Sequence, residues 1–288
     1  MPFWDMTAIA AILLLGVPHG GLDGAVARRV GWPVGLVPWL VFHLCYLALA
    51  ATVALLWWLY PLPSLAIFLF VSALHFGASD IADTGTTETG ISDNGIVSTG
   101  LPKISMDWLP WIAHGGLVCI AIPCLQPSLV APIFAILVGA ENASLLMAGI
   151  TQLFLPWSFC LVGYCGYAYL NPDYRKPLLN LLLLVGLASI LPPLISFSLY
   201  FCLWHSRRHM SRLWRSLALQ DRARSLYEAA IYTCAAWICA GFIFYFLQGS
   251  AITSIIQLTF IGLAALTLPH MLLVDYADRK QNNRKALP

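Results

Sequence analysis

Long apolar runs leave this chain of 288 residues few ways to fold. A helix that crosses the hydrocarbon core of a bilayer needs about 20 apolar residues, and backbone groups inside lipid must find their hydrogen bonds within the protein. Short alternating strands, as in a membrane barrel, are not seen. We therefore predict an all-α, polytopic integral membrane helical bundle of about nine transmembrane helices. The expected spans lie near residues 3–18, 36–59, 63–80, 108–126, 128–148, 152–170, 177–203, 227–247 and 251–274.

Composition agrees with a membrane protein and excludes several other classes. Hydrophobic residues make up 60% of the chain and charged residues 10%, whereas a soluble domain is about half apolar and about a quarter charged. A net charge of +2 gives no reason to expect a nucleic-acid partner. The eight cysteines lie in apolar stretches without a CxxC pair, so neither disulfides nor a thiolate metal site are expected.

The chain is expected to form a single membrane-embedded domain, 1–288. One polar segment, about 81–106, is rich in Gly, Ser and Thr and is expected to be an extramembrane loop. No internal repeat is visible. The N-terminal MPFWDM lacks a basic segment, so no cleavable signal peptide is expected.

The distribution of basic residues predicts an orientation. With the N-terminus outside and nine alternating spans, only Arg175 and Lys176 of the 15 Lys and Arg residues fall outside. Positive charge is enriched in cytoplasmic loops. We therefore expect a bacterial or archaeal inner-membrane protein with its N-terminus outside and its C-terminus in the cytoplasm. This topology also places all seven histidines in the inner half of the membrane.

Several histidines are followed by a carboxylate four or five residues later. The segments are PHGGLD with His19 and Asp23, HFGASD with His75 and Asp80, and PHMLLVD with His270 and Asp275. On a helix this spacing is about one turn, close enough for the acid to meet a ring on its own or a neighbouring helix. A metal-bound histidine usually gives its other ring N–H to a carboxylate or carbonyl.

The segment WHSRRH adds His205 and His209, which at i, i+4 lie on one face of a helix and suit a single metal ion. The alternative is an interfacial basic cluster formed with the neighbouring arginines, which would reach the lipid headgroups. For His43 and His114, a hydrogen-bonding role within the bundle is the simpler interpretation. Aspartates at membrane depth are costly and by default functional.

Neutral imidazoles without thiolates suit Zn, Fe, Cu or Ni. The HExxH signature of zinc proteases is absent, and seven histidines with one HxxxH are too few for the clustered boxes of a di-iron desaturase. A mononuclear Fe(II) site with about four histidines, leaving coordination positions open for O₂, fits best.

Four segments in order resemble the Brp/Blh family of membrane β-carotene 15,15′-dioxygenases, and the resemblance covers nearly the whole chain. They are PHGGLDG (18–24), HFGASD (75–80), WHSRRHM (204–210) and TLPHMLLVD (267–275). The resemblance implies an Fe(II)-dependent enzyme that splits the central double bond of β-carotene with O₂ into two molecules of retinal. It implies metal ligands at His19, His75, His205 and His209. His270 and His114 remain possible further ligands or supporting residues, as do Asp23 and Asp80.

The proposed substrates agree with a membrane enzyme. β-Carotene is a hydrocarbon that dissolves in the bilayer, where O₂ also partitions, and aromatic side chains suit a polyene. A rhodopsin-type protein is the expected consumer of the retinal product.

Two other classes were weighed. A transporter or metal-binding membrane protein would use the histidines as a relay or transit site, but no repeat typical of transporters is visible. A retinal-binding photoreceptor would need a lysine inside a helix, and the lysines at 103, 176, 280 and 285 lie in expected loops or the tail.

Overall fold

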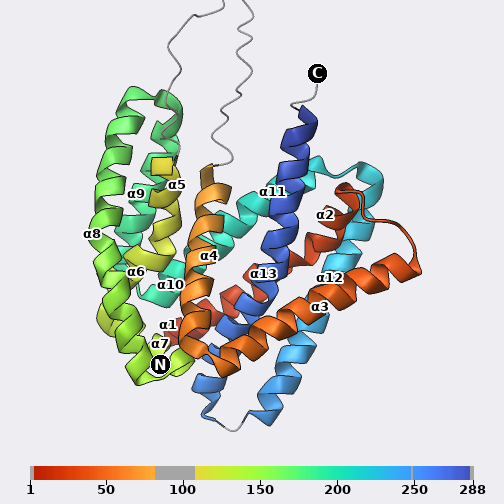
Figure 1. Ribbon diagram of the computed structural model, residues 1–288, viewed down its shortest axis with the longest axis horizontal. Coiled ribbons are helices and arrows are strands. Elements are labelled where there is room, and N and C mark those ends of the chain that lie inside the picture. Colours follow the sequence, from red (N-terminus) through yellow and green to blue (C-terminus); the bar gives the residue numbers. More distant parts are fainter. Residues whose placement is uncertain (1–2, 82–107, 248, 286–288) are drawn as a thin grey trace, which may run out of the picture.

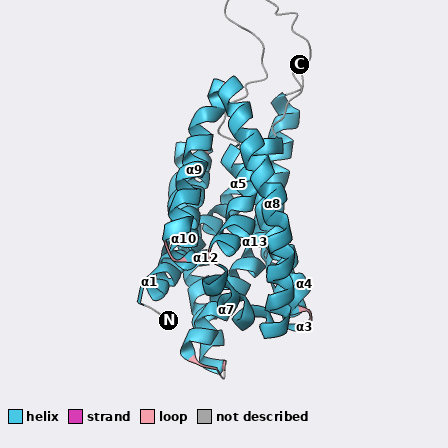
Figure 2. Cartoon of the chain, turned by 90° about the vertical axis from the view of Figure 1, so that its left-hand side faces the viewer, coloured by secondary structure: helices cyan, strands magenta, loops and turns pink. Residues whose placement is uncertain are grey.

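The computed structural model describes residues 3–81, 108–247 and 249–285, and every regular element in these ranges is a helix. The predicted all-α bundle is therefore confirmed for the described part of the chain (Figure 2). The expected loop at 81–106 lies outside the described residues, except that Ile81 ends a helix.

The described part of the first half of the chain contains ten helical elements, several of which follow one another without a break. The elements are α1 (Phe3–Ala11), η1 (Ile12–Gly16), η2 (Val17–Leu22), α2 (Asp23–Arg29), α3 (Leu36–Leu59), α4 (Pro61–Ile81), α5 (Trp108–Gly116), η3 (Leu117–Ala121), α6 (Ile122–Leu125) and α7 (Pro127–Val138). The elements η1 and η3 are π-helical, whereas η2 is a 3₁₀ helix.

The second half contains the longest helices. The elements are α8 (Ala140–Leu170), η4 (Pro172–Tyr174), α9 (Arg175–Ile190), α10 (Pro193–Ser198), η5 (Leu199–Ser206), α11 (Arg207–Ser216), α12 (Leu219–Phe246) and α13 (Ala251–Lys285). Figure 1 shows the N-terminus and the C-terminus at opposite ends of the bundle.

Seven helical segments of the described chain are long and apolar enough to cross a membrane, so the expected count of nine is not confirmed. They are Phe3–Arg29, Leu36–Leu59, Pro61–Ile81, Trp108–Leu125, Ala140–Leu170, Leu219–Phe246 and Ala251–Ala277. Many large hydrophobic side chains on α3, α8 and α12 are exposed on the isolated chain, as expected for helices that face lipid.

Three expected spans differ from the structure at two points, and backbone chemistry explains both. Gly139, with φ of 87°, ends α7 after 12 residues, so the predicted break between 148 and 152 lies instead at this glycine. The expected span 177–203 is interrupted between α9 and α10, where Pro192 precedes α10. Proline lacks the N–H that would continue the helix.

Glycines bring α4 and α5 into close contact. A Cβ atom built on Gly77 would collide with the carbonyl oxygen of Trp111, and one built on Gly115 would collide with that of Ala73. The Trp111 side chain also donates a hydrogen bond of 3.1 Å to the carbonyl of Leu74. This packing matters for function because α4 carries the HFGASD segment.

We predict that Gly77→Ala and Gly115→Ala each destabilise the bundle by about 1–3 kcal/mol, because the added methyl group must push two backbones apart. Thermal unfolding in detergent measures the effect. Gly149→Ala on α8 is the matched control, since a Cβ there meets no atom within 4 Å. Equal unfolding temperatures for Gly115→Ala and Gly149→Ala would contradict the prediction.

Candidate metal centre

Asp23 holds the ring of His270 at the contact between α2 and α13. The Nδ1 atom of His270 lies 2.6 Å from Oδ1 of Asp23. The Tyr46 hydroxyl on α3 donates 2.8 Å to Oδ2 of the same carboxylate and lies 3.2 Å from the carbonyl oxygen of Leu266. With Nδ1 protonated and donating to the carboxylate, Nε2 on the far side of the ring carries the lone pair that a metal requires.

Asp80 occupies the corresponding place at the end of α4. Its Oδ2 accepts a hydrogen bond of 2.9 Å from the Tyr200 hydroxyl. Nδ1 of His205 lies 3.7 Å from Oδ1, and Nδ1 of His114 lies 3.6 Å from Oδ2. These two distances exceed a hydrogen bond, so the carboxylate faces both rings as an electrostatic partner. The far nitrogen of His205 then points away from Asp80.

Four buried imidazoles form a connected group, which we call the histidine cluster: His75, His205, His209 and His270. The ring centroids of His75 and His205 are 5.2 Å apart, those of His75 and His270 are 6.1 Å apart, and those of His209 and His270 are 5.3 Å apart. The rings come from three separate parts of the chain: α4, the adjoining elements η5 and α11, and α13.

The donors and the spacing of the histidine cluster are those of a metal site. Metal–nitrogen bonds of about 2.1 Å would separate the ring centroids by about 4.5–6.5 Å, which includes the observed separations. As the side chains are placed, however, no three His, Cys, Asp or Glu residues in the described ranges have donor atoms positioned to hold one ion. The residue types and ring spacing fit a metal, and a turn of the rings is needed to aim their nitrogens at one point.

Two further histidines, His19 and His114, were predicted at or near the metal site. The backbone of His19 lies in η2, which packs against α11, α12 and α13, but its side chain lies outside the described side chains. His114 is 1% exposed, beside Asp80 and 6.0 Å from the Tyr164 ring. Unlike His205, it does not line the apolar cavity described below, which favours a supporting role.

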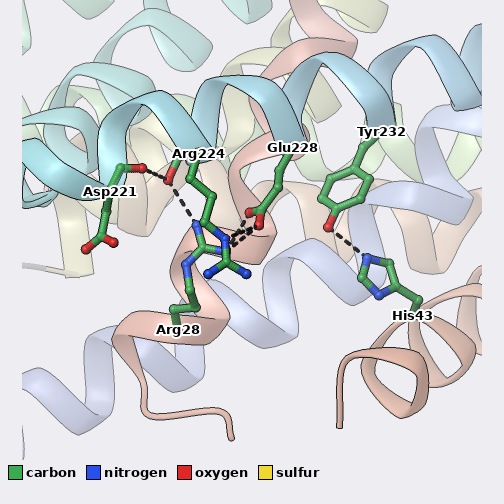
Figure 3. Close-up of polar contacts among 7 residues, drawn as sticks. Arg28, His43, Asp221, Arg224, Glu228 and Tyr232 are labelled. Carbon is green, nitrogen blue, oxygen red and sulfur yellow. Dashed lines mark hydrogen bonds and ion pairs between the residues drawn. The ribbon is translucent and has the colours of Figure 1, made fainter. Parts of the chain in front are cut away.

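His43 is a structural residue, as the sequence suggested. Its Nδ1 atom lies 2.6 Å from the carbonyl oxygen of Trp39, and its Nε2 atom lies 2.8 Å from the Tyr232 hydroxyl. Both ring nitrogens are thus engaged. The contact with Tyr232 is shown in Figure 3.

The same face of α12 anchors the PHGGLDG segment through charges. Nη1 of Arg28 on α2 lies 2.6 Å and 2.8 Å from the two carboxylate oxygens of Glu228. Nε of Arg224 lies 2.8 Å from Oε1 of Glu228 (Figure 3). Gly24 leaves room for Glu228, because a Cβ at this glycine would lie 3.0 Å from the carboxylate. This packing fixes α2 and therefore Asp23.

An apolar cavity meets the histidine cluster at one end. His75, His205 and His270 form its imidazole-lined part, with Phe76 and Phe201 beside them. Most of the remainder is aliphatic and aromatic, including Leu65, Phe68, Phe134, Leu137, Phe197 and Phe260. On α4 the lining runs from Leu65 to His75, a rise of about 15 Å. Such a site suits a long apolar ligand whose reacting atoms lie at the histidines.

The sequence analysis missed Tyr46 and Tyr200, the hydroxyl partners of the two aspartates. Tyr200 precedes His205 by five residues, but the chain has 11 tyrosines and neither stands out. The aromatic lining of the cavity was expected only as a class. Its members could not be named from sequence because every span contains aromatic residues.

Comparisons with known proteins agree with the geometry. The family model described as beta-carotene 15,15′-dioxygenase matches residues 10–278. A protein named beta-carotene 15,15′-dioxygenase from uncultured marine bacterium 66A03 is 34% identical over 292 residues, which covers 97% of this chain and 96% of the relative. A probable beta-carotene 15,15′-dioxygenase Blh from Halobacterium salinarum is 26% identical over 301 residues, covering 95% of this chain and 84% of the relative.

No solved structure matches the chain. The family model and the marine bacterial relative both span nearly all of it, including the four histidine segments. Their agreement decides between an oxidoreductase and a transporter. The chain belongs to the β-carotene 15,15′-dioxygenase family, whose members are carotenoid-cleaving enzymes.

Proposed function

We propose that this member of the family cleaves the central double bond of β-carotene with O₂ into two molecules of retinal at an Fe(II) site in the histidine cluster. The observation that carries the proposal is that buried imidazoles from separate helices lie at the end of an apolar cavity. The ligands would be drawn from His19, His75, His205 and His209, the residues expected from the sequence, and from His270, which lies among them.

When bound, Fe(II) would supply the activation of O₂. The chain's own residues perform the rest. Asp23 orients His270 and Asp80 orients His205, so that each ring presents Nε2 away from its carboxylate. The apolar wall holds the polyene by surface contact and excludes water, and it brings the central carbons beside the imidazoles.

We also propose the orientation of the chain in a bacterial or archaeal inner membrane, with the N-terminus outside and the C-terminus in the cytoplasm. Figure 1 shows the turn between α8 and α9 at the same end of the bundle as the C-terminus. Arg175 begins α9, so in this orientation Arg175 and Lys176 lie on the cytoplasmic side, where the positive-inside rule favours basic residues, and not outside as the nine expected spans would place them. A rhodopsin-type protein remains our proposed consumer of retinal.

Replacing a ligand histidine tests the metal centre. His75→Ala, His205→Ala, His209→Ala and His270→Ala should each abolish retinal formation in a carotene-producing host and lower the iron content of the purified protein. Asp23→Asn and Asp80→Asn should lower activity by about 10–100-fold, because the rings lose their orienting acceptor. Iron per chain and retinal per cell are the measurements.

His43→Gln is the control for the histidine variants, since His43 is engaged with Trp39 and Tyr232 outside the cluster. It should retain iron. A cluster variant that keeps full iron content and makes retinal at the normal rate would remove that histidine from the ligand set.

Removal of the metal tests the cofactor. Incubating the purified protein with an Fe(II) chelator should eliminate cleavage of β-carotene, and Fe(II) should restore it whereas Zn(II) should not, because zinc has no redox chemistry with O₂. Retinal formation under air is measured by absorbance. Undiminished cleavage by protein from which iron has been removed, with the metal content checked, would contradict the cofactor.

Labelling of introduced cysteines tests the orientation. Asp173→Cys lies between α8 and α9 and should be protected from a membrane-impermeant maleimide added to intact cells. Ser250→Cys, between α12 and α13 at the opposite end, should react. The unsubstituted chain supplies the background from the native cysteines. Labelling of Asp173→Cys from outside would instead agree with the nine alternating spans expected from sequence.

A further inference from the structure

Two hydroxyl groups interrupt the apolar wall of the cavity next to the histidine cluster. Ser72 and Thr267 are the hydroxyl-bearing residues among the described residues that line it. Each precedes a cluster histidine by three residues, Ser72 before His75 on α4 and Thr267 before His270 on α13. Residues three apart share a helix face, and the Cα atoms of each pair are about 4.5 Å apart along the helix axis.

Within the described part of the chain, neither hydroxyl makes a hydrogen bond, and the other buried hydroxyls without a partner, those of Ser206 and Thr233, do not line the cavity. Buried or half-buried hydroxyls in membrane helices usually bond to the carbonyl four residues earlier. Thr151, Ser158 and Thr259 do so, with distances of 2.7–2.8 Å. Ser72 is nevertheless only 4% exposed. The Ser72 oxygen itself is not fully enclosed by protein atoms, so its hydrogen bond is available to a ligand in the cavity that supplies an acceptor.

The reaction produces such an acceptor. Carotene is a hydrocarbon and offers none. Cleavage of the central double bond replaces one C=C bond with two C=O bonds, so each C20 arm acquires a carbonyl oxygen at the end that lay beside the histidines. An arm extending toward Leu65 and Phe134 would place this new oxygen where Ser72 and Thr267 line the wall.

We propose that Ser72 and Thr267 form a binding site for the aldehyde oxygen of the product, with each hydroxyl able to donate one hydrogen bond to it. The pair therefore recognises retinal and not the hydrocarbon substrate. The inference rests on the proposed function, because it takes the carbonyl from that reaction. The same site would select a C20 aldehyde or alcohol over a C20 hydrocarbon when these are added directly.

Direct binding tests the pair without requiring turnover. Purified protein in detergent is titrated with all-trans-retinal and with the C20 hydrocarbon that has the same ring and polyene but ends in a methyl group. Quenching of tryptophan fluorescence gives both dissociation constants. The unsubstituted chain should bind retinal more tightly than the hydrocarbon, by about two- to tenfold for each hydrogen bond formed.

Thr267→Val and Ser72→Ala should each reduce this preference, and the double variant should remove it. The hydrocarbon affinity in the same samples reports whether the cavity is intact. Thr267→Ser keeps the hydroxyl and should keep the preference. Thr259→Val and Ser158→Ala are matched controls, because those hydroxyls are engaged with Ile255 and Phe154 and lie outside the cavity lining.

Equal affinities of the unsubstituted chain for the two ligands would overturn the inference. So would an undiminished preference in the double variant, or a loss in Thr267→Ser as large as that in Thr267→Val. Failure of the proposed function gives a different result: carotene is not cleaved and iron is not bound, whatever the ratio of the two dissociation constants.

Discussion

The site depends on carboxylates buried against imidazoles in apolar surroundings. Asp23 and Asp80 are 3% and 2% exposed, and a carboxylate without partners at such depth would be strongly unfavourable. Each is accompanied by a tyrosine hydroxyl and a histidine ring from other helices. The surrounding helices must therefore pack in one arrangement, and this arrangement also sets which ring nitrogen faces the cavity.

Helix irregularities accompany this arrangement. The π-helical segments η3 and η5 contribute residues to the cavity wall, η1 packs against η5, and η5 ends immediately after His205. Single π turns often occur at functional sites, because the extra residue re-aims a side chain. In η5 the Phe201 ring stacks on His205 with centroids 6.2 Å apart, so the apolar wall and the imidazole are set by the same turn.

In the proposed site, hydrocarbon binding and oxygen chemistry would be divided along the cavity. Apolar and aromatic side chains contribute affinity without direction, whereas the imidazoles and the hydroxyls of Ser72 and Thr267 supply polar groups at one end. A cavity of this kind would position a symmetric polyene by its shape and by the point at which the apolar wall gives way to polar side chains. The polar end then acts only on atoms that reach it.

The sequence by itself determined the helical class, the membrane setting and the histidine–aspartate segments, because apolar length and residue chemistry are local properties. It did not determine that Asp23 meets His270 or that Asp80 lies close to both His114 and His205, since these partners are separated by up to 247 residues. The apolar pattern also led us to expect the helix break between residues 148 and 152. The break lies at Gly139, because the positive φ of this glycine ends the helix although the apolar sequence continues. Only tertiary packing decided which rings share a cavity, because a helix fixes the face a residue occupies but not the neighbour it meets.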